Sequence, residues 1–193
     1  MRTLYVVRHS LTEGNERRLY CGSTDLPLTG AGRALAKARA KDRPLPPCDL
    51  RVTSGMARTD ETLFLLTGRT PDIVIADLAE MRFGAFEMRG YEELREDADY
   101  RRWIGDCMGA GLVRCPGGES QSEYRARVLR GGAALLALEW RSALAVIHGG
   151  SIANLMDAWF PGEGKGFYDW QPGPCEGYAV RFDGDAPREY EVL

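Results

Sequence analysis

The chain has 193 residues, of which 44% are hydrophobic and 27% charged, and its net charge at pH 7 is −3. This length allows one domain with a substantial core, and the composition is ordinary for a globular protein. No run of like charge indicates nucleic acid or a membrane surface as a partner. No stretch approaches the ~20 apolar residues of a membrane span.

The cysteines form no recognisable disulfide or zinc pattern. There are five, an odd number, widely spaced and without a Cys-x-x-Cys pair. A disulfide framework or a zinc site would show an even number or close pairs. The N-terminus also lacks the long apolar core and cleavage site of a secretory signal. We therefore expect reduced thiols, no bound metal and a cytoplasmic protein.

Strands and helices are predicted to alternate along most of the chain. Apolar and β-branched runs predict strands at 4–7, 49–53, 73–75, 143–147, 177–182 and 188–192. Helices are predicted at 29–41 behind the N-cap Thr29, from Arg58 to a C-cap at Gly68, from Ser120 or Ser122 to 140, and at 151–160. The alternation implies an α/β fold, with a mainly parallel central sheet and helices on both faces.

Two stretches are less regular. Residues 11–28 are predicted to be a long loop, and residues 79–117 an irregular excursion with short helices around 91–103. Long ordered loops near a site are often functional. No repeat or shift of composition marks a boundary. Residues 1–193 are therefore predicted to form a single domain, in which the excursion contributes to the substrate pocket.

Basic side chains follow three of the predicted strands. Arg8 and His9 follow the first, Arg58 follows the second, and His148 follows the strand at 143–147. The carboxyl ends of parallel strands gather at one edge of a sheet, where ligands bind. The chain has two histidines, and both occupy such a position. We therefore expect these four side chains to face one crevice.

These residue types suit a phosphoryl group. Guanidinium groups pair with phosphate oxygens and stay charged at any working pH. Histidine is largely neutral at pH 7 and can attack phosphorus, which splits hydrolysis into two easier steps. The second histidine and the N–H groups of Gly149 and Gly150, placed just before a helix, can hold the developing negative charge. This chemistry needs no metal or other cofactor.

Four motifs span almost the whole chain in a fixed order. They are Val-Arg-His-Ser (7–10) with Thr12 and Asn15, Gly22-x-x-Asp25-x-Pro27-Leu28-Thr29-x-x-Gly32, Thr53-Ser54 with Arg58 and Glu61-Thr62, and Val146-Ile147-His148-Gly149-Gly150. Together they resemble the histidine phosphatase, or phosphoglycerate-mutase-like, superfamily. The resemblance implies the three-layer architecture of that superfamily and a phosphohistidine mechanism.

Carried over to this chain, the resemblance implies that His9 is the nucleophile and becomes phosphorylated. It also implies that Arg8, Arg58 and His148 form the rest of the phosphate pocket. Asn15 resembles a further contact of the phosphate loop, although a plain turn residue is the competing interpretation. We add Gly149 to the phosphate-binding residues for its backbone N–H.

The proton donor of the family is an acidic residue in a segment that resembles residues 78–84 of this chain. The resemblance therefore points to Glu80 as the acid that protonates the departing oxygen, with Glu87 as the competing candidate. The chain departs from the family pattern at Ser10, where relatives usually have Gly. It departs again at Phe86-Glu87-Met88, where phosphatase relatives tend to have Trp-Glu-Gly.

Residues after Glu80 indicate the branch of the family. Three short motifs resemble the branch of α-ribazole and broad-specificity phosphatases: Tyr91-Glu92-Glu93-Leu94, Tyr100-Arg101-x-Trp103 and Pro116-Gly117-Gly118-Glu119-Ser120. The chain also lacks the longer basic insertion that is typical of the mutases at this place. Possible further contacts to a substrate anion are Arg82, Arg101, Arg102 and Arg114.

The predicted activity is hydrolysis of small phosphomonoesters, such as α-ribazole phosphate or a sugar phosphate. The first alternative is a phosphoglycerate mutase, which shares the phosphohistidine step. The second, motivated by Ser10, is a weakened module that binds phospholigands without turnover. The expected partner is a small phosphorylated metabolite, and both a monomer and a homodimer are compatible with the sequence.

Overall fold

The protein is described from a computed structural model that covers residues 1–107 and 109–193. The strands found in these residues are β1 (Arg2–Arg8), β2 (Leu50–Thr53), β3 (Ile73–Val74), β4 (Ser142–Ile147), β5 (Gly177–Asp183) and β6 (Ala186–Val192). They form one sheet in the order β3-β2-β4-β1-β5-β6. The first four are mutually parallel, whereas β5 and β6 run antiparallel at one edge. The predicted mainly parallel sheet is confirmed.

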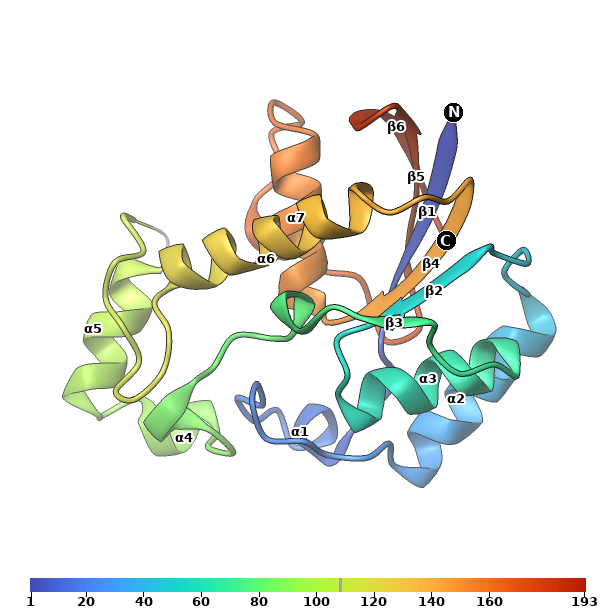
Figure 1. Cartoon of the computed structure of the whole chain (residues 1–193). Helices are drawn as coiled ribbons and strands as arrows, with labels where there is room; N and C mark the ends of the chain where they lie inside the picture. The colour runs from blue at the N-terminus through green and yellow to red at the C-terminus, as the bar shows by residue number, and fades with distance from the viewer. Residues whose placement is uncertain (108) are drawn as a thin grey trace.

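Helices cover both faces of this sheet. The α-helices described are α1 (Glu13–Glu16), α2 (Gly30–Asp42), α3 (Ala57–Thr67), α4 (Tyr91–Leu94), α5 (Ala98–Asp106), α6 (Gln121–Leu136) and α7 (Gly149–Trp159). The 3-10 turns are η1 (Ala76–Leu78), η2 (Gly84–Phe86) and η3 (Phe167–Trp170). Figure 1 shows α2 and α3 on one side of the sheet, and α6 and α7 on the other.

Residues 4–7 of strand β1 are apolar without interruption, and both faces of the strand are covered there. Leu4 and Val6 are fully buried in the larger core, which α6 and α7 close. Val7 points to the opposite face and packs with Leu63 and Leu66 of α3 in the smaller core. Side chains alternate across a strand, so a strand buried on both faces needs apolar residues at every position.

Several helix ends match their predicted signals. The Thr29 side chain accepts a hydrogen bond from the Gly32 N–H at 3.0 Å and so caps α2. Gly68 ends α3 in the left-handed conformation, with φ of 70°. The cap of α6 is Ser120 rather than Ser122, in a capping box completed by Glu123. Each cap satisfies N–H or C=O groups that the helix leaves unpaired.

Some boundaries differ from the prediction. Helix α6 ends at Leu136 instead of 140, and α7 begins at Gly149, two residues early. The predicted loop at 11–28 contains the short helix α1, started by a capping box between Thr12 and Asn15. Short polar side chains that bond nearby backbone also favour turns. The capping signal was therefore hard to separate from a turn.

The excursion at 79–117 holds η2, α4 and α5, as the prediction of short helices required, and Met108 within it lies outside the described residues. Its centre is an aromatic cluster, defined here as Tyr20, Phe83, Phe86, Tyr100 and Trp103, with neighbouring ring centroids 5.1–6.0 Å apart. Such edge-on and tilted contacts stabilise the packing of aromatic rings. In the described part of the chain, no helix has the length and apolar character to cross a bilayer.

Candidate active site

The carboxyl ends of the central strands bring the two histidines together. His9 follows β1, His148 follows β4, and these strands are neighbours in the sheet. Their ring centroids lie 5.1 Å apart, and both side chains are buried. Arg58 reaches the same place from the first turn of α3 and is also buried. The predicted convergence of these side chains at one edge of the sheet is therefore observed.

The surroundings of His9 set its tautomer. The Nδ1 atom lies 2.6 Å from the carbonyl oxygen of Ser10. A carbonyl can only accept, so Nδ1 carries the proton and the neutral ring keeps its lone pair on Nε2. Burial, and then the nearby charge of Arg58, lower the pKa of His9 to about 3. At neutral pH the ring is uncharged, with one nitrogen free to act as a nucleophile.

The second histidine has the opposite tautomer. The Arg58 Nε–H donates to His148 Nδ1 at 3.3 Å, so the proton of the neutral ring is on Nε2. That Nε2–H donates to the Ser54 hydroxyl at 2.8 Å. Burial, followed by the charge of Arg58, lowers the pKa of His148 well below its usual value. Both ring nitrogens of His148 are therefore engaged, so the ring positions the Arg58 guanidinium and has no lone pair free to attack.

The two arginines differ in how much of their donor capacity the protein uses. Arg58 donates from its terminal nitrogens to the carbonyls of Thr24 and Gly22, at 2.9 and 2.8 Å. Arg8 donates to the carbonyl of Pro172 at 2.9 Å, and its Nε is buried without a partner among the described residues. Because a guanidinium has five N–H donors, both arginines keep donors for an anion.

Glycine at position 149 leaves room for the Arg8 guanidinium. A Cβ atom at Gly149 would lie 3.2 Å from both Cζ and Nε of Arg8. The glycines expected before the helix lie inside its first turn, and the Gly150 N–H donates to Glu80 Oε2 at 3.2 Å. In this structure that N–H therefore orients the carboxylate.

The structure separates the two candidate proton donors. Glu80 lines the same pocket as Arg8 and His9 and accepts a 2.5 Å hydrogen bond from the Tyr124 hydroxyl. Burial, and then the Glu80 carboxylate, raise the pKa of Tyr124 well above its usual value, so the phenol remains a donor. Sequence reasoning missed Tyr124, because no motif marks a tyrosine inside the predicted helix at 120–140.

Glu87 has a structural role in the loop before α2. Its carboxylate accepts hydrogen bonds from the backbone N–H groups of Gly22, Ser23 and Phe83, at 2.8–3.1 Å. Burial alone would raise the pKa of Glu87, but these hydrogen bonds outweigh burial and lower it. Glu87 is not among the residues that line the pocket, whereas Glu80 is, which leaves Glu80 as the better candidate.

Asn15 is both a turn residue and a lining residue of the pocket. Its Oδ1 accepts from the N–H and the hydroxyl of Thr12, at 3.0 and 2.9 Å, so the residue closes the turn that begins α1. It also lines the pocket. With its oxygen used by the protein, the side-chain amide nitrogen is the group that remains to contact an anion.

The pocket has a volume of about 700 Å³ and two chemically different parts. One part holds His9, Arg8, Arg58 and Glu80, whereas the fully buried His148 is not among the lining residues. The other is walled by aromatic and apolar residues, among them Tyr20, Phe83, Trp103 and Phe167. A volume of this size exceeds a phosphate ion and suits a phosphoryl group attached to a sizeable apolar body.

The four arginines proposed as extra anion contacts are engaged elsewhere. Each forms an ion pair with a glutamate or aspartate, and none lines the pocket: Arg82 with Glu119, Arg101 with Glu96, Arg102 with Asp99, and Arg114 with Glu123. The pocket instead contains Arg18, which sequence reasoning missed because it follows the motif at 7–15 in a stretch expected to be loop.

Ser10 is accommodated without strain. Its side chain is fully buried, and its hydroxyl donates to the carbonyl of Gly32 at 2.7 Å. It is not among the residues with positive φ. The hydroxyl therefore points into the protein, and the alternative of a weakened site loses the observation that motivated it.

Met88 occupies a backbone conformation that glycine would adopt at lower cost. Its φ is 57°, in the left-handed region, which costs a residue with Cβ roughly 1–2 kcal/mol. Met88→Gly is therefore expected to raise the free energy of unfolding by about 1 kcal/mol relative to Met88→Ala. Urea denaturation of the two variants checks this, and equal stabilities would show that the backbone here is unstrained.

The buried neutral histidines make stability depend on pH. Unfolding restores an ordinary pKa near 6.5 to both, whereas burial keeps the pKa of His9 at about 3 in the folded state. Below pH 6.5 the unfolded state binds more protons, so stability falls, approaching about 1.4 kcal/mol per pH unit for each histidine. Urea unfolding in phosphate-free buffer between pH 7.5 and 5 measures this slope. In the His9→Gln variant the slope should decrease by the contribution of one histidine. An unchanged slope would contradict the conclusion that His9 is buried in its neutral form.

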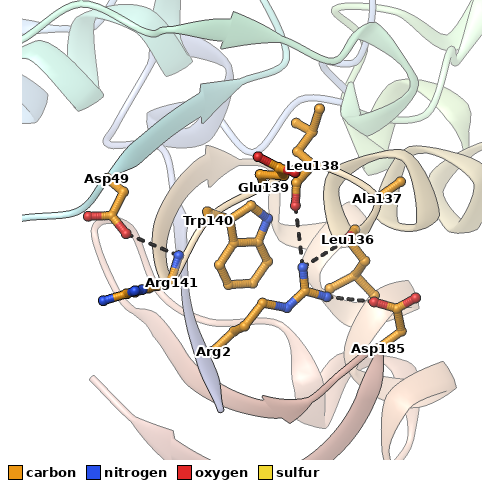
Figure 2. Close-up of a pocket in the computed structure, with 9 residues that line it drawn as sticks. All are labelled: Arg2, Asp49, Leu136, Ala137, Leu138, Glu139, Trp140, Arg141 and Asp185. Carbon is orange, nitrogen blue, oxygen red and sulfur yellow. Dashed lines mark hydrogen bonds and ion pairs between the residues drawn. The ribbon is translucent and has the colours of Figure 1, made fainter.

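A second hollow lies at the other end of the sheet, where β1 begins (Figure 2). Its central residue is Arg2, whose guanidinium stacks 4.4 Å from the Trp140 ring and donates to the carbonyls of Leu136 and Leu138. It also pairs with Asp185 at 2.6 Å. These contacts tie the end of α6 to the sheet and leave Arg2 little capacity for a ligand.

No cluster of three or more His, Cys, Asp or Glu side chains suited to a metal ion is found at residues 1–107 and 109–193. The site is thus defined by two histidines, two arginines and a carboxylate at the edge of a parallel sheet. The family model described as histidine phosphatase superfamily (branch 1) matches residues 4–192. The chain belongs to this superfamily, and the predicted family membership is confirmed.

Known relatives include both phosphatases and mutases. The chain is 38% identical over 111 residues to the adenosylcobalamin/alpha-ribazole phosphatase of Salmonella typhimurium, a match that spans 55% of each protein. It superposes on the alpha-ribazole phosphatase of Shigella flexneri with a TM-score of 0.86 and 26% identity, covering 99% of this chain and 95% of that one. The corresponding values for the phosphoglycerate mutase of Thermus thermophilus are 0.76 and 30%, covering 99% of both chains. The implied phosphoglycerate-mutase-like architecture is confirmed.

Proposed function

We propose that the protein hydrolyses small phosphomonoesters through a phosphohistidine at His9. The single observation that supports this most is the tautomer of His9, because the Ser10 carbonyl holds the proton on Nδ1 and leaves Nε2 as a nucleophile. Arg8 and Arg58 would bind the phosphoryl oxygens through the N–H donors that the protein leaves free.

In the first step, the lone pair of His9 Nε2 forms a bond to phosphorus while the bond from phosphorus to the ester oxygen breaks. Glu80, protonated at this stage, gives its proton to that oxygen, so an alcohol leaves. The Nδ1–H bond to Ser10 stabilises the positive charge that the phosphorylated ring acquires. The arginines stabilise the charge on the phosphoryl oxygens in the transition state, and His148 positions Arg58 by accepting its Nε–H.

In the second step, water attacks phosphorus and Glu80, now a carboxylate, takes a proton from it. The bond between nitrogen and phosphorus breaks, and inorganic phosphate leaves. The Tyr124 hydroxyl and the Gly150 N–H keep the Glu80 carboxylate oriented for both transfers. The cycle uses groups of the protein and water alone.

The character of the pocket wall favours a phosphatase over the mutase alternative. The basic residues at 82, 101, 102 and 114 are paired with acidic neighbours outside the pocket and do not bear on the choice, because Arg18 lines the pocket. The wall formed by Tyr20, Phe83 and Trp103 is apolar and suits a less polar leaving group. Some relatives are mutases, so an assay must distinguish phosphate release from isomerisation.

The test measures phosphate release from an aryl phosphate in the presence of a chelator, together with rapid acid-free quenching of the enzyme. We expect steady turnover and a protein-bound phosphoryl group that is labile to acid and stable to alkali, as phosphohistidine is. Isomerisation of phosphoglycerate with little phosphate release would instead establish the mutase. Binding of phosphate with neither reaction would overturn the proposal of an enzyme.

A further inference from the structure

Arg18 is an unpaired cation at the active-site pocket. It lines the pocket, and its side chain is exposed and has no ion pair or side-chain hydrogen bond within the described part of the chain. Its neighbour Arg17 has the same charge but pairs with Glu13 at 2.6 Å. Arg18 therefore presents an uncompensated charge to whatever occupies the pocket.

The backbone of Arg18 is held in an unfavourable conformation by its surroundings. Its φ is 55°, which costs a residue other than glycine roughly 1–2 kcal/mol. The neighbouring backbone is fixed on both sides, because the Arg18 N–H donates to Asn15 and the Leu19 N–H donates to Gly14, at 3.1 and 2.8 Å. These two hydrogen bonds form the C-terminal cap of α1, in which the residue after the C-cap is usually left-handed, and they fix where the Arg18 side chain begins.

The three arginines that line the pocket are not equivalent. They are Arg8, Arg18 and Arg58. A bound phosphoryl group pairs with Arg8 and Arg58 at the phosphate site. Arg18 has no acidic partner among the described residues, so it is the lining arginine that is left to pair with a second anionic group of the substrate.

Resting on the proposed function, we infer that Arg18 is a specificity-determining residue that binds a second anionic group of the substrate. The aromatic wall of Tyr20 and Phe83 shares the pocket with Arg18 and with the phosphate site. The substrate class is therefore a phosphomonoester with an apolar, planar body that carries a carboxylate or another anion apart from its phosphate. A guanidinium suits such an oxyanion through paired hydrogen bonds.

The test compares phenyl phosphates that carry a para carboxyalkyl chain of one to three methylene groups with their matched neutral amides. The methylene groups separate the charge from the leaving oxygen, so each pair differs chiefly in charge. For the wild-type protein we expect kcat/KM of the best carboxylate to exceed that of its amide by about fivefold, as an exposed ion pair supports. The preference should decline as ionic strength rises.

Variants assign this preference to one side chain. Arg18→Gln should reduce the ratio of carboxylate to amide to about one, and Arg18→Lys should retain part of it. Arg17→Gln removes the same charge one residue away, outside the pocket, and should keep the wild-type ratio. Circular dichroism verifies that each variant is folded.

The outcomes distinguish the inference from the function on which it rests. Hydrolysis of the amides with a ratio that Arg18→Gln leaves unchanged, or a wild-type ratio of one at all three chain lengths, would overturn the role of Arg18 while the phosphatase stands. Equal loss of the ratio in Arg17→Gln would overturn it as well, because net charge alone would then explain the preference. No hydrolysis of any ester above the level of His9→Ala would refute the phosphatase and the inference together.

Discussion

Replacing His9 with alanine is expected to lower phosphate release from an aryl phosphate by at least about 10⁴-fold, because the covalent step loses its nucleophile. The buried pocket offers no replacement, since Nδ1 of His148 is engaged by Arg58 and its Nε2 by Ser54. Steady-state phosphate release in the presence of a chelator measures the loss. No phosphoryl group should be trapped on the variant protein.

The second histidine supplies the matched control. His148→Asn removes a residue of the same type that is buried beside His9, with the two ring centroids 5.1 Å apart. It should slow the reaction, but the phosphoryl group should still be trapped on His9. Trapping on the His9→Ala protein, or turnover unaffected by that substitution, would identify a different nucleophile.

Replacing Glu80 with glutamine is expected to reduce kcat/KM in proportion to how poor the leaving group is. Glutamine keeps the shape of the side chain but cannot give a proton, so alkyl phosphates should lose about 10²–10⁴-fold, the usual contribution of general acid catalysis. A nitrophenyl ester, which leaves readily as an anion, should lose far less. A series of phosphates with leaving groups of graded pKa measures the difference.

Glu87→Gln is the control for this prediction, since Glu87 was the competing candidate. Its carboxylate joins the loop at 22–24 to Phe83 through hydrogen bonds. The substitution should lower the free energy of unfolding by about 1–3 kcal/mol, the cost of weakening several hydrogen bonds to a partly buried, charged carboxylate. It should leave the dependence on the leaving group as in the wild type. If Glu87→Gln rather than Glu80→Gln steepened that dependence, the assignment of the acid would be reversed.

The parts of the fold predicted from sequence are those with local signals. Continuous apolar runs predicted β1 and β4 because both strands are covered on two faces. Thr29 and Gly68 marked the ends of helices because their side chains or backbone satisfy the terminal groups. Helix α1 was missed because one capped turn has too few residues to show a period.

The sequence predicted the site residues that directly follow strands. It did not predict the residues that distant elements bring to the pocket. The convergence of His9 and His148 follows from topology alone, since their strands are adjacent and parallel. Tyr124 and Arg18 carry no motif, and their position in the pocket depends on how α6 and the segment after α1 pack. The choice between Glu80 and Glu87 likewise depended on the packing that brings Glu80, and not Glu87, to the pocket.

Strand β1 lies between β4 and β5, and this placement affects how the chain is made. Val6 pairs with Ala145 on one side and with Tyr178 on the other. During synthesis, at about 5–20 residues per second, β1 must wait on the order of ten seconds before either neighbour exists. Throughout that time an apolar strand with unpaired edges is open to association with other chains. We therefore expect the yield of folded protein to depend on chaperones that protect its first residues more than on the stability of the finished fold.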